Sequence, residues 1–372
     1  MRQRVTRHAA LELRPLLQTQ LDHEPASPRH DTSIRGRPAA PFSDYRPNFG
    51  TRVLAQRGLL RLFTEPDITA AELMDVAERS VAVFEELHDE LGLVRAWRLK
   101  GQAHYLDRSA RISAEASEEA LRHARLAGDS FEEREIAEWL VIALLLGPAP
   151  AAAASRRCRE LSREFAGVPL LQAEIIATLA SLEAMLGHLE EAMALIDHVE
   201  ETTRSLGEWN WLAIWHAFVF LWLDDPISAE LTLLPAYAAL KQMGEKSHFS
   251  TIVHALSHAL YMQGRYEEAE DLTHECEEAA RPNDVHSQIS WRSVRAKALA
   301  RMGEHEQAER LAREALAYAE ASDFLLAHAE ALADLGEVLG IVGRPWEAAE
   351  AYRTALKVYA RKGNELANGR RS

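Results

Sequence analysis

Two histidines four residues apart, His254 and His258, are the residues of this sequence most able to do chemistry. On a helix this spacing places both rings on one face, where they could hold a zinc ion. A zinc site needs at least one further ligand, which His274 or Cys276 could supply. Cys276, however, is expected to point into a helix stack. We therefore favour the alternative in which both histidines face a groove, and we expect no metal ion and no cofactor.

Motifs for nucleotide or acyl chemistry are absent from the sequence. The segment GEKS at 244–247 has Glu245 between the glycine and the lysine, and Ala239 stands where a phosphate-binding loop needs its first glycine. No GxSxG, HExxH, CxxC or GxGxxG occurs either. The sequence thus predicts no catalytic residues, and an enzyme with an unrecognised site is the third of three alternatives.

The charge of the chain limits its partners. The formal net charge is −15, although residues 1–50 carry eight arginines against five acids. An acidic surface is repelled by phosphate backbones, so nucleic acid is not an expected partner. Two distant cysteines, Cys158 and Cys276, offer no disulfide framework, and no secretory signal is recognisable. We expect a cytoplasmic protein.

The run EWNWLAIWHAFVFLWLDDP, residues 208–226, holds four of the eight tryptophans. Its apolar part, 211–223, is far shorter than the roughly 20 residues of a spanning helix, and it contains His216. A membrane segment is therefore rejected. The remaining alternatives are a buried helix and an aromatic ligand site.

The elements that position these residues follow from an internal repeat. Turn residues recur at 187, 224, 264, 303 and 343, each with an alanine five residues later. Apolar residues recur at three- and four-residue steps from residue 51 onward, which is typical of helices. Small residues before and after each turn let antiparallel helices approach closely. Further helices are expected near 51–63, 69–89, 91–107, 115–127, 131–146 and 150–166.

The last repeat carries a family resemblance. Gly336 before the turn, followed by Gly343, Ala348, Tyr352 and Ala355, resembles the tetratricopeptide (TPR) pattern. The segments LEAMLGHLEEAMAL and ALADLGEVLGIVGRPWEAAEAYRTALKVYARKGN also resemble the repeat region of bacterial signalling proteins in which a nucleotide cyclase and a STAND-type ATPase precede the repeats. The resemblance implies a TPR-like solenoid.

Together these patterns predict an all-α protein. We expect a right-handed α-solenoid of about eight antiparallel helix pairs with a period of about 40 residues. Residues 51–365 would form the repeat domain. Residues 1–50 are rich in proline and arginine and are expected to be a disordered lead, and 366–372 a flexible tail.

The first helix of each pair would line a concave groove. In the repeat register its wall changes from aromatic to histidine and tyrosine, then to basic and finally to acidic side chains. Trp215 and His216 are expected to be core residues instead. The predicted groove residues are Trp211, Phe218, Trp222, His254, His258, Tyr261, Lys297, Arg301, Glu330 and Glu337.

Two functions fit such a groove. The first is a non-catalytic scaffold, in bacterial signalling or regulation, that binds a protein or peptide through aromatic anchors and graded charge. The second is an effector-sensing repeat arm of a cyclase/STAND-ATPase-type regulator, which could bind a small molecule. The sequence does not determine the oligomeric state.

Overall fold

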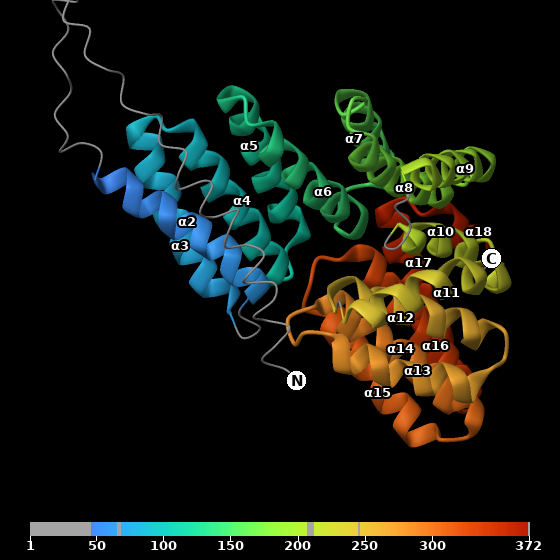
Figure 1. Ribbon diagram of the computed structural model, residues 1–372. Helices are drawn as coiled ribbons and strands as arrows, with labels where there is room; N and C mark the ends of the chain where they lie inside the picture. Colours follow the sequence, from blue (N-terminus) through green and yellow to red (C-terminus); the bar gives the residue numbers. More distant parts are fainter. Residues whose placement is uncertain (1–45, 65–67, 207–211, 245, 371–372) are drawn as a thin grey trace, which may run out of the picture. The chain divides into compact units, whose positions relative to one another are not determined.

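The computed structural model describes residues 46–64, 68–206, 212–244 and 246–370. All secondary structure within these ranges is helical (Figure 1). The helices are α2 (Arg46–Thr64), α3 (Ala70–Leu87), α4 (Glu90–Leu106), α5 (Ala110–Ala127), α6 (Ser130–Leu146), α7 (Ala151–Glu164), α8 (Pro169–Met185), α9 (Leu189–Leu206), α10 (Ala213–Trp222), α11 (Pro226–Met243), α12 (Ser247–Met262), α13 (Tyr266–Ala279), α14 (Val285–Met302), α15 (His305–Glu320), α16 (Leu325–Ile341), α17 (Pro345–Lys362) and α18 (Glu365–Arg370).

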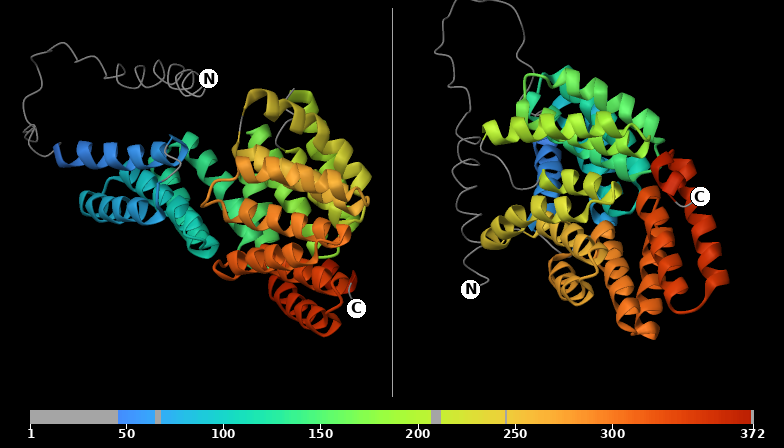
Figure 2. Two further views of the ribbon diagram at one scale, coloured as in Figure 1. Left: turned by 90° about the horizontal axis from the view of Figure 1, so that it is seen from below. Right: turned by 90° about the vertical axis from the view of Figure 1, so that its right-hand side faces the viewer.

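Consecutive helices pack as pairs, from α2 with α3 to α16 with α17 (Figure 2). The first helix of a pair also packs on the first helix of the next pair, as α12 does on α14 and α14 on α16. This stacking is that of an α-solenoid, and it confirms the predicted fold class. No helix in the described part of the chain is long and apolar enough to cross a membrane.

The repeated turns end one helix and start the next. Gly264, Gly303 and Gly343 have φ values of +79°, +93° and +82°, which glycine adopts without a Cβ clash. Asp224 takes the same place with φ +64°, since aspartate is among the few residues that tolerate this region. Asp225 then caps α11 by accepting a hydrogen bond from the Ser228 amide at 3.0 Å.

Small residues let paired helices pack closely. A Cβ on Gly336 would lie 3.0 Å from the Tyr352 ring, so any larger residue at this position of α16 would displace this ring of α17 by a few tenths of an ångström. Cys276 is fully buried, and its thiol donates to the Ser250 carbonyl at 3.2 Å. Burial raises the pKa of the Cys276 thiol. Cys276 is therefore a packing residue.

The last helix pairs fold back onto the middle of the chain. The Asp323 carboxylate accepts hydrogen bonds from the amides of Ala110 and Arg111, at 2.6 and 3.0 Å, and so caps α5. The fully buried Lys362 ammonium donates to the carbonyls of Leu144, Gly147 and Ala149 at 2.8–2.9 Å.

Two boundaries differ from the composition-based expectation. α2 begins at Arg46, inside the expected lead 1–50. Pro47 does not prevent this start, because proline is compatible with the first turn of a helix. Residues 366–370 of the expected tail 366–372 lie in α18, whose Ala367 amide donates to the Asn364 side chain at 3.0 Å. Residues 1–45 lie outside the described residues.

Candidate functional site: an inner cavity

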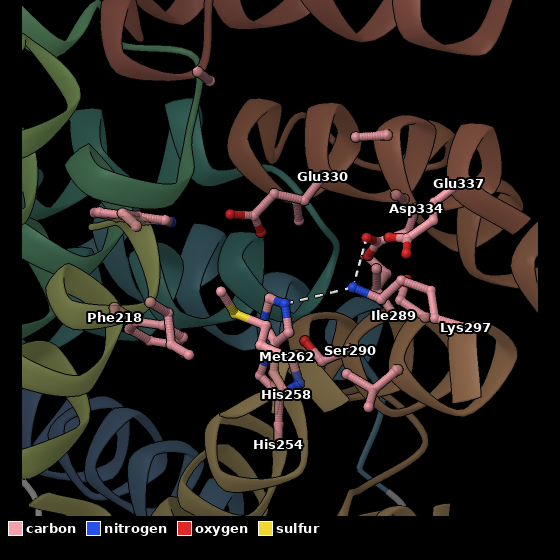
Figure 3. A pocket seen from close by; sticks show the side chains of 18 of the residues that line it. Phe218, His254, His258, Met262, Ile289, Ser290, Lys297, Glu330, Asp334 and Glu337 are labelled. Atoms are coloured by element: carbon pink, nitrogen blue, oxygen red, sulfur yellow. Dashed lines mark hydrogen bonds and ion pairs between the residues drawn. The ribbon is translucent and has the colours of Figure 1, made fainter. Parts of the chain in front are cut away.

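A cavity of about 350 Å³ lies on the inner side of the later helix pairs (Figure 3). Its wall comes from α8, α10, α12, α14, α16, α17 and α18. The structure brings most of the predicted groove residues together here. They are Phe218, Trp222, His254, His258, Tyr261, Lys297, Glu330 and Glu337.

The other two predicted groove residues lie elsewhere. Arg301 is outside the lining but binds two lining residues, with its Nε 3.1 Å from the Tyr261 hydroxyl and its Nη2 2.8 Å from Glu337 Oε1. Trp211 falls outside the described residues.

One wall of the cavity is aromatic. The rings of Phe218 and Trp222 are stacked with centroids 6.3 Å apart, one turn apart on α10. Met185 from α8 and Met262 from α12 extend this surface. The stacked rings and the flexible methionine side chains form an apolar surface that can adapt to the shape of a ligand.

The neighbouring residues of α10 pack in the core, as expected from the sequence. His216 is 4% exposed, and burial lowers its pKa to about 4. Trp215 is partly buried against the core clusters, and its ring is tilted against that of Phe218, with centroids 6.1 Å apart.

Two histidines, His254 and His258, continue the wall from the aromatic pair, and a third, His286, packs against His254 without lining the cavity. The His254 ring centroid lies 6.3 Å from Phe218, 6.2 Å from His258 and 5.9 Å from His286. Burial lowers the pKa of all three rings. The positive charge of Lys297 lowers the pKa of His254 and His258 further. At neutral pH this part of the wall is therefore uncharged.

A polar row crosses three helices beside the histidines. Lys297 on α14 is 3% exposed; its ammonium lies 2.8 Å from Asp334 Oδ1 on α16 and 3.4 Å from His258 Nε2 on α12. Figure 3 shows Lys297 pointing between these two partners. Because an ammonium only donates, His258 Nε2 is the acceptor, which assigns the proton to Nδ1.

A second row lies one turn further along the same helices. The Tyr261 hydroxyl on α12 donates to Glu337 Oε1 on α16, and Arg301 on α14 binds both groups. Burial is the main reason that the pKa of Tyr261 is raised. The two rows hold the inner helices at fixed spacing and give the wall a preset pattern of charge.

The alternative zinc site is not assembled. His274 binds Glu270 at 2.8 Å and Arg295 at 3.0 Å, and Cys276 is directed to Ser250. Among the described residues the group with metal-ligand spacing is Glu183, His188 and Glu191. Arg159 already binds the two carboxylates, at 3.0 and 2.8 Å, and so supplies the cation of that group.

Several lining residues were not predicted. Tyr359, Leu366 and Ala367 enter the wall because α17 and α18 fold back, and Met185 comes from an earlier pair. Asp334 was expected one step off the groove stripe, but its ion pair with Lys297 brings it into the wall. Leu366 and Ala367, which belong to the expected tail 366–372, reach the wall from α18. The repeat register carries no signal for these long-range contacts.

The lining is suited to binding more than to proton transfer. A general acid or base works best with a pKa near the operating pH, whereas the histidine pKa values here are displaced downward. Lys297 and Arg301 form ion pairs with Asp334 and Glu337, two carboxylates of the lining. The cavity thus provides a ligand with an enclosed space, an aromatic surface and paired charges held in place by the helices.

Known proteins share this architecture. Residues 287–361 match the tetratricopeptide repeat family. A Rap protein complexed with competence and sporulation factor matches with a TM-score of 0.65 and 14% identity, covering 97% of this chain and 95% of that one. At this identity the likeness shows the fold alone, which is a TPR-type helical solenoid over the aligned length.

Two further solved structures are less similar. The apo form of the quorum sensor NprR from B. thuringiensis matches with a TM-score of 0.42 and 13% identity, over 66% of this chain and 74% of that one. BtubC from P. vanneervenii has a TM-score of 0.28 and 15% identity, over 79% and 92% of the two chains. The curated proteins contain no match to this chain.

Proposed function

We propose that this protein is a non-catalytic binding scaffold whose inner cavity takes a short peptide segment of a signalling or regulatory partner. The observation that carries the proposal is the convergence of helices from four successive pairs, α10 to α17, on one cavity with an aromatic seat and two charged rows. Its volume of about 350 Å³ is at the lower end of the range for ligand sites.

The volume of the cavity limits the length of peptide that it can hold. A cavity of about 350 Å³ is too small for a long extended peptide, so the peptide would enter by one end or insert a few side chains. The Phe218 and Trp222 rings would anchor an apolar side chain, and the paired charges of α14 and α16 would orient the backbone.

The fold neighbour supports this choice. The Rap protein of similar fold was solved in complex with competence and sporulation factor, so a solenoid of this architecture can hold a signalling factor. A small-molecule effector is the second candidate, favoured by the limited cavity volume. The cyclase/STAND-ATPase context has no counterpart among the comparisons and stays a prediction.

The test uses a pool of synthetic peptides of three to seven residues. Peptides retained by the protein in ultrafiltration are identified by mass spectrometry, and their affinities are measured by calorimetry. We expect Phe218→Ala/Trp222→Ala to weaken the retained peptides by tenfold or more, since buried aromatic anchors are worth about 1.4 kcal/mol or more each.

The matched control is Phe131→Ala/Trp346→Ala, which removes two aromatic side chains that are 60% and 86% exposed and do not line the cavity. It should leave the affinities unchanged. Equal retention by the Phe218/Trp222 variant, with helix content intact by circular dichroism, would remove the cavity as the binding site. Failure of the wild type to retain any peptide would instead favour the small-molecule effector.

A further inference from the structure

The outward face of α11 carries an apolar stripe. Ile227, Leu231 and Leu234 are 61%, 66% and 42% exposed. Their spacing of four and three residues places them on one side of the helix. The opposite side of α11 is buried in the core through Ala229, Leu233, Ala236 and Leu240. The helix is therefore apolar on two faces, a property typical of helices that are covered on both.

The repeats show that the fold does not require this stripe. The three positions lie three, seven and ten residues after the turn residue Asp224. At the same distances from the turns at 264, 303 and 343 the chain has exposed, mostly charged side chains. They are Glu267, Asp271 and His274 in α13, Glu306, Arg310 and Arg313 in α15, and Trp346, Glu350 and Arg353 in α17. The apolar stripe is thus a feature that α11 has beyond the needs of the repeat.

A groove lies directly beside the stripe. It has a volume of about 320 Å³ and is formed by α11, α12 and α13. Leu234 belongs to both the stripe and the groove, and Leu256, Leu260 and Leu272 line it further. The stripe therefore continues into an apolar depression, which is where a partner's side chains could insert. No residue lines both this groove and the inner cavity.

The rim of the groove is acidic. Glu230, Glu268, Asp271 and Glu275 line it, against Arg265 alone. Arg265 binds Glu230 at 2.8 Å and Glu268 at 2.6 Å, and Lys241 binds Glu275 at 2.8 Å. Four carboxylates thus face two cations, in a chain of net charge −15. A second copy of this chain would bring like charges together, whereas a basic partner would complement them.

We propose that the α11 stripe and its groove dock an amphipathic helix of a partner protein, with apolar residues at three- and four-residue spacing and lysine or arginine beside them. This surface is separate from the inner cavity. The protein would accordingly carry one ligand inside and one helical partner outside, so that the two sites can be tested independently.

The experiment uses the full chain and three synthetic 18-residue peptides in fluorescence anisotropy. The first has leucines at helical i, i+3, i+4, i+7 spacing and lysines elsewhere. The second has the same composition, scrambled to destroy the stripe, and the third has glutamate in place of lysine. We expect the first to bind the wild-type protein at least tenfold more tightly than either control.

The decisive variant is Ile227→Glu/Leu231→Glu. It removes the apolar seat but adds negative charge, so general electrostatic attraction would predict tighter binding of the lysine peptide, whereas docking on the stripe predicts a loss of tenfold or more. Leu126→Glu/Phe131→Glu adds the same charges at positions that are 62% and 60% exposed on other helices, and it should bind like the wild type.

Three results would overturn the proposal. One is equal binding of the striped and scrambled peptides. Another is unchanged or tighter binding by the Ile227/Leu231 variant. The third is a wild-type dimer in sedimentation that this variant dissociates, because the occupant of the stripe would then be a second copy of the chain. All substituted side chains are exposed, so the variants should fold, and circular dichroism verifies it.

Discussion

At the scale of single residues, the inner wall combines polar groups that satisfy one another. His258, Lys297 and Asp334 form one row, and Tyr261, Arg301 and Glu337 form the next. Each row takes one residue from each of three successive inner helices. A buried ammonium such as that of Lys297 is tolerated only with such partners, because an unpaired charge costs several kcal/mol in a protein interior.

His216 gives a prediction at this scale. Its folded-state pKa is about 4, lowered by burial, against 6.5 for the unfolded chain. The unfolded state binds the proton first, so the free energy of unfolding should fall as pH decreases from 6.5 to about 4. One such group accounts for about 1.4 kcal/mol per pH unit, about 3 kcal/mol over the window.

Urea unfolding of the wild type and of His216→Leu at pH 7.5, 6, 5 and 4.5 measures this contribution. The leucine variant should lose less stability over the range, by up to about 3 kcal/mol. His305→Leu, at an exposed position of α15, is the control and should follow the wild type. Parallel pH profiles for wild type and His216→Leu would contradict the buried neutral state of this ring.

At the scale of elements, the start of α5 depends on a residue more than two hundred positions away. Asp323 caps α5 through the Ala110 and Arg111 amides, while the Asp323 amide donates to the Arg108 carbonyl at 3.0 Å. The Tyr105 and Phe324 rings meet beside it with centroids 5.3 Å apart. Asp323 therefore joins two distant helix pairs as well as capping the N-terminus of α5.

We predict that Asp323→Ala lowers the free energy of unfolding by about 0.5–2 kcal/mol, the usual range for loss of a helix cap. Asp323→Asn should cost less, since its single carbonyl oxygen can still accept one amide. Chemical unfolding followed by circular dichroism gives both values. An alanine variant as stable as Glu306→Ala, a change at an exposed position, would show that the cap contributes nothing.

At the scale of the whole described repeat array, Lys362 connects the last long helix to the end of α6 and the loop that follows it. Burial lowers the pKa of Lys362 to about 7. The ammonium has three N–H groups for three carbonyl acceptors, whereas a neutral amine has two. An open solenoid has contacts between neighbouring repeats alone, so this contact adds coupling between distant repeats.

Lys362→Met should uncouple the two segments that the ammonium joins. We expect faster amide hydrogen exchange in α17–α18 and, together with it, in residues 144–154, because three carbonyls lose their donor. Lys357→Met changes an exposed lysine of the same helix and should leave both segments protected. Faster exchange confined to α17 would show that the coupling does not exist.

The sequence by itself determined the helices and their pairing, because both are local. Apolar spacing near 3.6 residues sets the buried face of each helix, and the turn residues at 187, 224, 264, 303 and 343 all have positive φ values in the structure. The repeat register then predicted which side of each first helix faces inward. That register alone groups Phe218, His258, Lys297 and Glu337, which all line the inner cavity.

Only the tertiary structure decided which distant helix pairs meet and which apolar side chains stay exposed. The contacts of Asp323 with α5 and of Lys362 with the α6–α7 loop join residues 212–218 positions apart, and no local period encodes such a separation. The exposure of Ile227 and Leu231 could not be predicted from the sequence either. The pattern of apolar residues along a helix does not show whether another element covers them.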